Sequence, residues 1–143
     1  MKTFVVDASV AAKWWLPRVQ EELVTQAENL AQSHLRGFLL LAVPDLFWGE
    51  LANVFWKAAR TGKILPAEAI AGLNKMMGLS LASHPTSDLA SNALEIALRY
   101  DRTVYDSLYV ALALKLGTDL ITADQRLANA LAAHLPVKWL GSI

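Results

Sequence analysis

Short apolar segments alternate with segments of helical periodicity along the chain, and this alternation restricts the possible folds more than any other feature. Five apolar runs have the length of buried strands, at residues 2–6, 39–43, 79–82, 119–121 and 137–140. Between them the sequence predicts helices over residues 8–15, 21–33, 46–60, 66–77, 87–99, 106–116 and 124–133. Strands that alternate with helices form a parallel sheet with helices on both faces. The predicted fold class is therefore α/β, with one domain over residues 1–143.

The composition excludes several classes of protein. No apolar run reaches the ~18 residues of a membrane helix, and no charged segment precedes an apolar one as in a signal peptide. We therefore expect no membrane contact and a cytoplasmic location. The absence of cysteine excludes disulfides and thiolate metal sites. The 13 basic and 13 acidic residues balance, which counts against a high-affinity, non-specific nucleic-acid binder. They do not exclude an enzyme that holds RNA through a metal and a few arginines.

Four acidic residues that are far apart in the chain stand where their carboxylates can face one pocket: Asp7, Glu50, Asp106 and Asp124. Asp7 directly follows the first predicted strand, and Asp124 follows the fourth by three residues. In open parallel sheets, ligands bind beyond the carboxyl ends of the strands, where the strand order reverses. Carboxylates that converge there cost free energy unless a cation neutralises them. The four acids therefore predict a divalent metal site.

Each aspartate alone also fits a structural role. Asp7 and Asp106 stand where a helix begins, so either can be an N-cap. Thr122 and Gln125 match a capping box, which places Asp124 in a first helical turn, where the helix dipole favours negative charge. For these three aspartates the residues alone leave both interpretations open.

Glu50 is harder to explain as a structural residue. It is four residues from both Leu46 and Val54, on or beside the apolar stripe of its helix. A carboxylate near a buried face needs a partner, which Asn53 or a metal ion can supply. The alternative is a glutamate at the edge of the stripe that reaches water.

The segments around these acids resemble a known family. The chain reads Val-Val-Asp7-Ala-Ser9-Val-Ala-Ala-Lys13-Trp-Trp near its start, then carries the helix acid Glu50, then Thr103-Val-Tyr-Asp106-Ser-Leu-Tyr and Leu-Ile-Thr122-Ala-Asp124. Taken in order, from residue 3 to about residue 140, these segments are similar to PIN-domain ribonucleases, and more narrowly to the VapC-type toxins of toxin–antitoxin pairs. The resemblance implies a three-layer α/β/α fold whose parallel five-strand sheet has the order 3-2-1-4-5.

The resemblance also implies a set of site residues. It assigns the family's four catalytic, metal-binding carboxylates to Asp7, Glu50, Asp106 and Asp124. Ser9 and Thr122 match its accessory hydroxyl positions and are expected to orient the carboxylates. Oxygen ligands suit Mg²⁺ or Mn²⁺. Basic residues near the site motifs are candidates for RNA contacts, with solvated surface charges as the alternative: Lys13, Arg18, Arg102 and Arg126.

The implied function is that of a metal-dependent endoribonuclease, the toxin of a VapBC-type pair. Its expected partners are RNA, a cognate VapB-like antitoxin and a second copy of the chain. Four tryptophans fit either a groove for such a partner or the core: Trp14, Trp15, Trp48 and Trp56. Two alternatives remain open. One is a stand-alone RNA-processing nuclease, and the other is a non-catalytic module that binds a metal or a partner.

Overall fold

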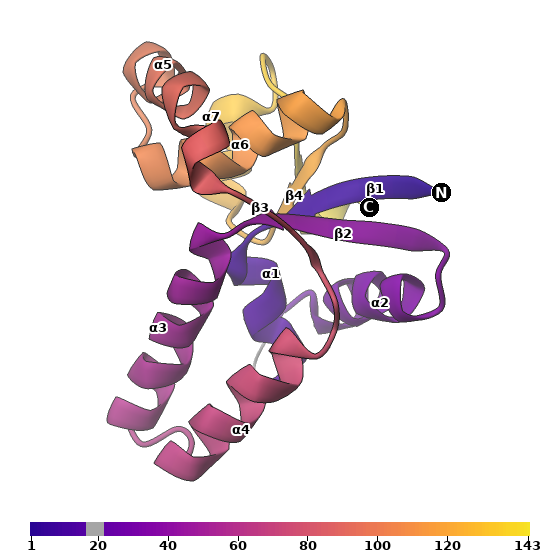
Figure 1. Ribbon diagram of the computed structural model, residues 1–143, viewed down its shortest axis with the longest axis vertical. Helices are drawn as coiled ribbons and strands as arrows, with labels where there is room; N and C mark the ends of the chain where they lie inside the picture. Colours follow the sequence, from indigo (N-terminus) through magenta and orange to yellow (C-terminus); the bar gives the residue numbers. More distant parts are fainter. Residues whose placement is uncertain (17–21) are drawn as a thin grey trace.

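A parallel five-strand sheet forms the centre of the molecule (Figure 1). The computed structural model describes residues 1–16 and 22–143. Its strands are Lys2–Val6 (β1), Leu39–Pro44 (β2), Ala82–His84 (β3), Leu120–Thr122 (β4) and Val137–Trp139 (β5). They are hydrogen-bonded in the order β3-β2-β1-β4-β5, and all four pairs are parallel. The predicted fold class and strand order are confirmed, and the order reverses between β1 and β4.

Helices cover both faces of this sheet. They are Ala8–Ala11 (α1), Val24–Leu35 (α2), Leu46–Arg60 (α3), Pro66–Met77 (α4), Ala90–Tyr100 (α5), Val104–Leu116 (α6) and Gln125–Leu131 (α7). The described residues also form three 3₁₀ turns, at Ala12–Trp14 (η1), Thr86–Asp88 (η2) and Leu140–Ser142 (η3). Figure 1 shows α5 and α6 on one side of the sheet and α1 and α2 on the other, while α3 and α4 project together as a hairpin.

The strand predicted at 79–82 and the helix predicted at 87–99 each begin three residues later than expected. The third strand, predicted at 79–82, begins at Ala82 because Ser80, in the segment after α4, has a left-handed backbone with φ of 57°, which a strand cannot contain. The helix predicted at 87–99 begins at Ala90, after the turn η2. Asp45 holds this turn: its carboxylate accepts hydrogen bonds from the Thr86 N–H, at 2.9 Å, and from the Thr86 hydroxyl. Asp45 also occupies the N-cap position of α3, but its side chain makes no capping hydrogen bond there because it is bound to η2.

The first two predicted helices also differ at their ends. The helix predicted at 8–15 is an α-helical turn, α1, followed by the 3₁₀ turn η1. The second was predicted from residue 21, which lies outside the described residues, and α2 begins at Val24.

The helix α6 is the best-buried helix next to the sheet, and it positions part of the site. Seven consecutive residues, from Ser107 to Ala113, are buried, because α6 lies between the sheet and α5. A helix that is apolar on all sides is a core helix. Contacts of α6 with β1 and β2 fix its place on the sheet. None of the helices in residues 1–16 and 22–143 has both the length and the apolar character to cross a membrane.

The four tryptophans divide between the two roles expected of them. Trp14, Trp15 and Trp48 are half-buried and pack against the core, and the Trp14 indole donates a hydrogen bond to the Ala27 carbonyl at 2.8 Å. Trp56, on the projecting α3, is 55% exposed. Core packing therefore explains three of them, and Trp56 is the one that lies on a surface.

Candidate metal centre

All four predicted acids lie around the carboxyl ends of β1 and β4. Asp7 and Asp124 are the N-cap residues of α1 and α7, which follow these strands, while Glu50 is near the start of α3 and Asp106 is in the first turn of α6. Asp124 raises the pKa of Asp106, and Asp106 raises the pKa of Glu50, so these carboxylates are close enough to repel one another. Among the described residues, however, no three His, Asp or Glu side chains are grouped closely enough to hold one ion together.

Asp7 is the most deeply buried of these carboxylates, with 9% of its surface exposed. Its Oδ1 accepts hydrogen bonds from Ser9 N at 3.1 Å, Ser9 Oγ at 2.5 Å and Val10 N at 3.3 Å. Burial nevertheless raises the pKa of Asp7 to about 6, because loss of hydration outweighs these bonds. The residue is both a helix cap and a carboxylate whose negative charge the protein does not fully compensate.

Two hydroxyl groups join the end of β1 to the end of β4, at the positions expected for Ser9 and Thr122. The Ser9 hydroxyl donates to Asp7 and accepts a hydrogen bond from Ala123 N at 3.0 Å. Thr122 is fully buried, and its Oγ1 lies 3.5 Å from Ser9 Oγ and accepts a bond from Asp124 N at 3.0 Å. Both hydroxyls therefore fix the backbone from which the carboxylates extend.

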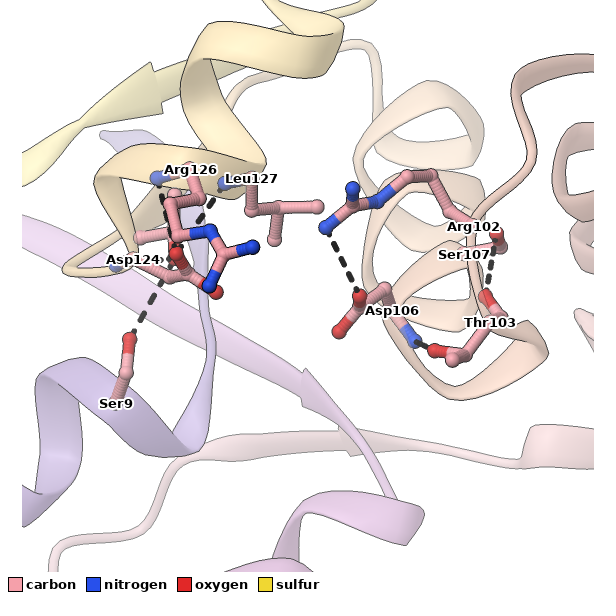
Figure 2. A network of polar contacts seen from close by, with 9 residues as sticks. Ser9, Arg102, Thr103, Asp106, Ser107, Asp124, Arg126 and Leu127 are labelled. Atoms are coloured by element: carbon pink, nitrogen blue, oxygen red, sulfur yellow. Dashed lines mark hydrogen bonds and ion pairs between the residues drawn. The ribbon is translucent and has the colours of Figure 1, made fainter.

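Asp124 itself caps α7 (Figure 2). Its Oδ1 accepts hydrogen bonds from Arg126 N at 3.0 Å and Leu127 N at 3.2 Å. The predicted capping box starting at Thr122 is wrong, because Thr122 still belongs to β4 and Asp124 occupies the N-cap position instead.

Asp106 is not a helix cap, contrary to one of the two interpretations. The N-cap of α6 is Thr103, whose Oγ1 accepts a hydrogen bond from Asp106 N at 3.1 Å. The Asp106 carboxylate pairs with Arg102, with 3.7 Å between Nη2 and Oδ2. Burial raises the pKa of Asp106, and Arg102 opposes this effect. In Figure 2 the Arg102 guanidinium extends toward Asp106, while Asp124 and Arg126 lie on the opposite side.

Tyr109 is a site residue that sequence reasoning missed. Its hydroxyl donates a hydrogen bond of 2.5 Å to Glu50 Oε1, so the partner found for Glu50 is Tyr109 and not Asn53. Burial raises the pKa of Glu50, and the Tyr109 bond opposes this. Burial and the neighbouring Glu50 also raise the pKa of Tyr109. A signal was present, because Tyr109 is three residues after Asp106 and therefore lies on the same face of α6.

The four basic candidates have different places. Arg102 and Arg126 lie beside Asp106 and Asp124. Lys13 lies in η1, after α1. Arg18 lies outside the described residues.

Comparisons with known proteins agree with this fold. Residues 4–131 match the PIN domain family. Ribonuclease VapC3 of Pyrobaculum aerophilum is 36% identical over 131 residues, which cover 90% of this chain and 95% of that protein.

Two solved structures share the fold. PAE2754 from Pyrobaculum aerophilum superposes with a TM-score of 0.68 at 22% identity, covering 99% of this chain and 91% of that one. Mycobacterium tuberculosis VapC20, described as a sarcin–ricin loop cleaving toxin, gives a TM-score of 0.66 at 18% identity, covering 92% and 95%. The resemblance stated from the sequence is thus confirmed: this chain belongs to the PIN domain family and is a homologue of the VapC ribonucleases.

Proposed function

We propose that this protein is a metal-dependent endoribonuclease that acts as the toxin of a VapBC-type toxin–antitoxin pair. The observation that carries the proposal is the buried Asp7, whose pKa is raised to about 6 at the edge of the sheet where three further carboxylates gather. A carboxylate held there without a full set of compensating partners is suited to a cation. Membership of the VapC ribonuclease family supports RNA as the substrate.

The residues at this edge fit Mg²⁺ or Mn²⁺ in their chemistry, because they offer oxygen atoms and negative charge. We assign Asp7 and Asp106 as direct ligands, and Asp124 to a second ion or to contact through water. Glu50 orients the attacking water or completes the coordination. Among the described residues, no three His, Asp or Glu side chains are close enough to hold one ion together. We therefore expect each ion to use one or two carboxylates and several waters, as Mg²⁺ commonly does. A bound ion supplies charge neutralisation and an activated water for hydrolysis of the phosphodiester.

The surrounding residues hold these groups in place. Ser9 orients the Asp7 carboxylate by a hydrogen bond from its hydroxyl, and the Thr122 hydroxyl holds the backbone of Asp124 by accepting from its N–H. Tyr109 holds Glu50 in the same manner from α6. For the RNA backbone we assign phosphate contacts to the basic residues named above: Lys13, Arg18, Arg102 and Arg126. Arg102 already neighbours Asp106, so its charge is available where a scissile phosphate would lie.

The test is cleavage of a linear and of a circular single-stranded RNA with Mg²⁺ or Mn²⁺, and with EDTA. We expect the metal-loaded protein to open the circle, which only an endonuclease can do, and to lose activity in EDTA. Asp7→Asn and Asp106→Asn should lose activity in metal. If the wild type and both variants behaved alike, the ribonuclease proposal would be lost. If only linear RNA were degraded, the enzyme would be an exonuclease.

The toxin role needs a separate test, because catalysis alone does not distinguish it from a stand-alone RNA-processing nuclease. Exposed apolar side chains on the α3–α4 hairpin, such as Trp56, Leu65 and Ile70, support a protein partner. We expect expression in the cytoplasm to arrest growth, and an antitoxin encoded beside the gene to relieve the arrest. Harmless expression of an active enzyme would favour the stand-alone nuclease. Light scattering should give twice the chain mass of 15.6 kDa for the expected homodimer.

A further inference from the structure

We propose that a hollow beside Glu50 is a subsite for one nucleobase of single-stranded RNA, next to the phosphate that is cleaved. The hollow has a volume of about 470 Å³ and is lined, around Glu50, by Ala8, Leu46, Gly49, Asn53, Val54 and Tyr105. This inference rests on the proposed ribonuclease function and adds which part of the RNA the protein reads.

The position of the hollow follows from the elements that line it. Ala8 is next to Asp7 on α1, and Tyr105 is next to Asp106 on α6. The third wall is α3, which carries Glu50 itself. The hollow is therefore built from the same three elements as three of the four carboxylates. An RNA whose phosphate lies at these carboxylates has its neighbouring base at the hollow.

The chemistry of the walls suits a base better than a phosphate. Tyr105 is 60% exposed, so its ring does not serve the core and offers a face on which a base can stack. The side chains of Leu46 and Val54 are apolar, and the exposed Asn53 amide can both donate and accept hydrogen bonds at a base edge. Among the described lining residues, Glu50 alone is charged at neutral pH, and its charge is negative. A phosphate would be repelled from this interior, whereas a neutral base would not.

Gly49 is a second, independent sign that the hollow is kept open. Glycine weakens a helix interior relative to other residues, yet Gly49 lies within α3. Outside its chain neighbours and the adjacent backbone of α3, a Cβ added at Gly49 would meet no atom within 4 Å, so no close packing requires glycine there. A larger side chain at this position would instead occupy the hollow. Gly49 thus allows a test that fills the subsite without a steric clash in the fold.

The experiment compares Gly49→Leu and Tyr105→Ala with Tyr105→Phe, which keeps the ring. Ala67→Leu, at an exposed position of α4, is the control for an added leucine side chain. Each protein cleaves a pool of single-stranded RNA with one randomised segment, so that the base preference beside the cut can be read, and kcat and KM are measured on one preferred sequence. Thermal unfolding and calorimetric binding of Mn²⁺ without RNA are recorded for each protein.

We expect the wild type to prefer certain bases at one position beside the cut. Tyr105→Ala should raise KM by about tenfold, within the range found for loss of one base–aromatic stack, and should weaken that preference, whereas Tyr105→Phe should retain both. Gly49→Leu should lower kcat/KM and change the preference, with an unfolding temperature at least that of the wild type and unaltered Mn²⁺ affinity. Ala67→Leu should behave as the wild type.

Three results would overturn the inference. If the wild type cleaves RNA but Gly49→Leu and Tyr105→Ala keep its preference and its KM, the subsite proposal alone is wrong. If these variants cleave normally but are no longer neutralised by the antitoxin, the hollow binds a protein segment instead of RNA. If the wild type cleaves no RNA, the proposed function fails and the subsite fails with it.

Discussion

The two halves of the carboxylate centre are held in different ways. Asp7 and Asp124, at the strand ends, accept hydrogen bonds from backbone N–H groups at the start of α1 and α7. The Ser9 hydroxyl ties these two strand ends together, because it accepts a hydrogen bond from Ala123 N–H and lies 3.5 Å from the Thr122 hydroxyl. The other two carboxylates lie on helices. Glu50 accepts a hydrogen bond from Tyr109 of α6, and Asp106 pairs with Arg102 in the loop before α6. The strand half is thus fixed by the main chain, and the helix half is fixed by side chains.

This difference predicts how each half responds when a ligand binds. Backbone groups of a strand end cannot move without disturbing the sheet, so Asp7 and Asp124 are oriented before any ion arrives. The Tyr109 hydroxyl and the Arg102 guanidinium can change partner by rotation about side-chain bonds. We therefore expect substitutions in the strand half to alter both folding and activity, and those in the helix half to alter mainly ligand affinity.

Asp7→Asn should have the largest effect, and it should lower activity while it raises stability. Removal of the buried charge should lower RNA cleavage by more than about 100-fold. Loss of a residue that only hydrogen-bonds to a metal ligand costs up to about 100-fold, and Asp7 is proposed as a ligand itself. In EDTA at pH 8, the same change should stabilise the fold by about 2–3 kcal/mol, since the pKa of Asp7 rises from 3.8 to about 6. The measurements are cleavage rates and the free energy of unfolding in urea.

The sign of this effect can be checked with pH. The folded state binds the Asp7 proton more tightly than the unfolded chain does, so Asp7 makes the wild type lose stability as pH rises from about 4 to about 6. Asp7→Asn should lack this part of the loss, and the difference between the two proteins should be small at pH 3. Equal pH profiles for the two would show that the Asp7 charge is already compensated.

Ser9→Ala tests whether the strand half depends on its hydroxyl bridge. The change removes one bond to Asp7 and leaves Ala123 N–H without its partner. We expect the free energy of unfolding to fall by about 1–3 kcal/mol and cleavage to fall by about 10- to 100-fold. Ser91→Ala, at an exposed site on α5, is the control. Unaltered stability of Ser9→Ala would mean that the two strand ends hold together without this bridge.

Tyr109→Phe tests the helix half, with a smaller expected effect on folding. Loss of the hydroxyl frees Glu50, so Mn²⁺ affinity should fall by about tenfold, while phenylalanine keeps the buried ring packing. The measurement is Mn²⁺ calorimetry on Tyr109→Phe, Glu50→Ala and the double variant. If Tyr109 acts through Glu50, the double variant should bind as Glu50→Ala alone does. A further loss in the double variant would assign Tyr109 a packing role.

Arg102→Ala should have the smallest effect. An ion pair with both side chains partly exposed contributes less than about 1 kcal/mol, so stability should hardly change. Because Arg102 competes with a metal for Asp106, its removal should tighten Mn²⁺ binding a few-fold and raise the KM for RNA, with a weaker dependence on salt. Arg126→Ala, which removes a charge beside Asp124, serves as the comparison. Weaker Mn²⁺ binding in Arg102→Ala would contradict this competition.

The architecture could be predicted from the sequence because it depends on local patterns. The apolar run at the N-terminus forms β1 with the predicted bounds, and Pro66 begins α4 where a first-turn proline is expected. The third strand was misplaced because the left-handed conformation of Ser80, a non-glycine residue, leaves no mark in the sequence. The caps were misassigned because periodicity locates a helix but does not tell which nearby polar residue, such as Thr103 or Asp106, closes its end.

The candidate site could be predicted only as far as the topology determines it. The reversal of strand order between β1 and β4 brings the residues after those strands together, whatever else the chain does. The contacts of Glu50 with Tyr109 and of Asp106 with Arg102 depend on how closely α3 and α6 approach and on side-chain rotamers. Neither quantity is a local property of the sequence, so these partners required the structure.

The hydrogen bond between Ser9 and Ala123 also has a consequence for synthesis, because the two residues are 114 positions apart. A ribosome produces β1 first, yet the strand that flanks it on one side, β4, comes after β2, β3 and most of the helices. Contacts between such distant segments close late in folding. A growing chain therefore carries Asp7 for most of translation with no Asp124 beside it. The order in which the segments are made thus keeps the carboxylate centre incomplete until β4 and α7 have left the ribosome.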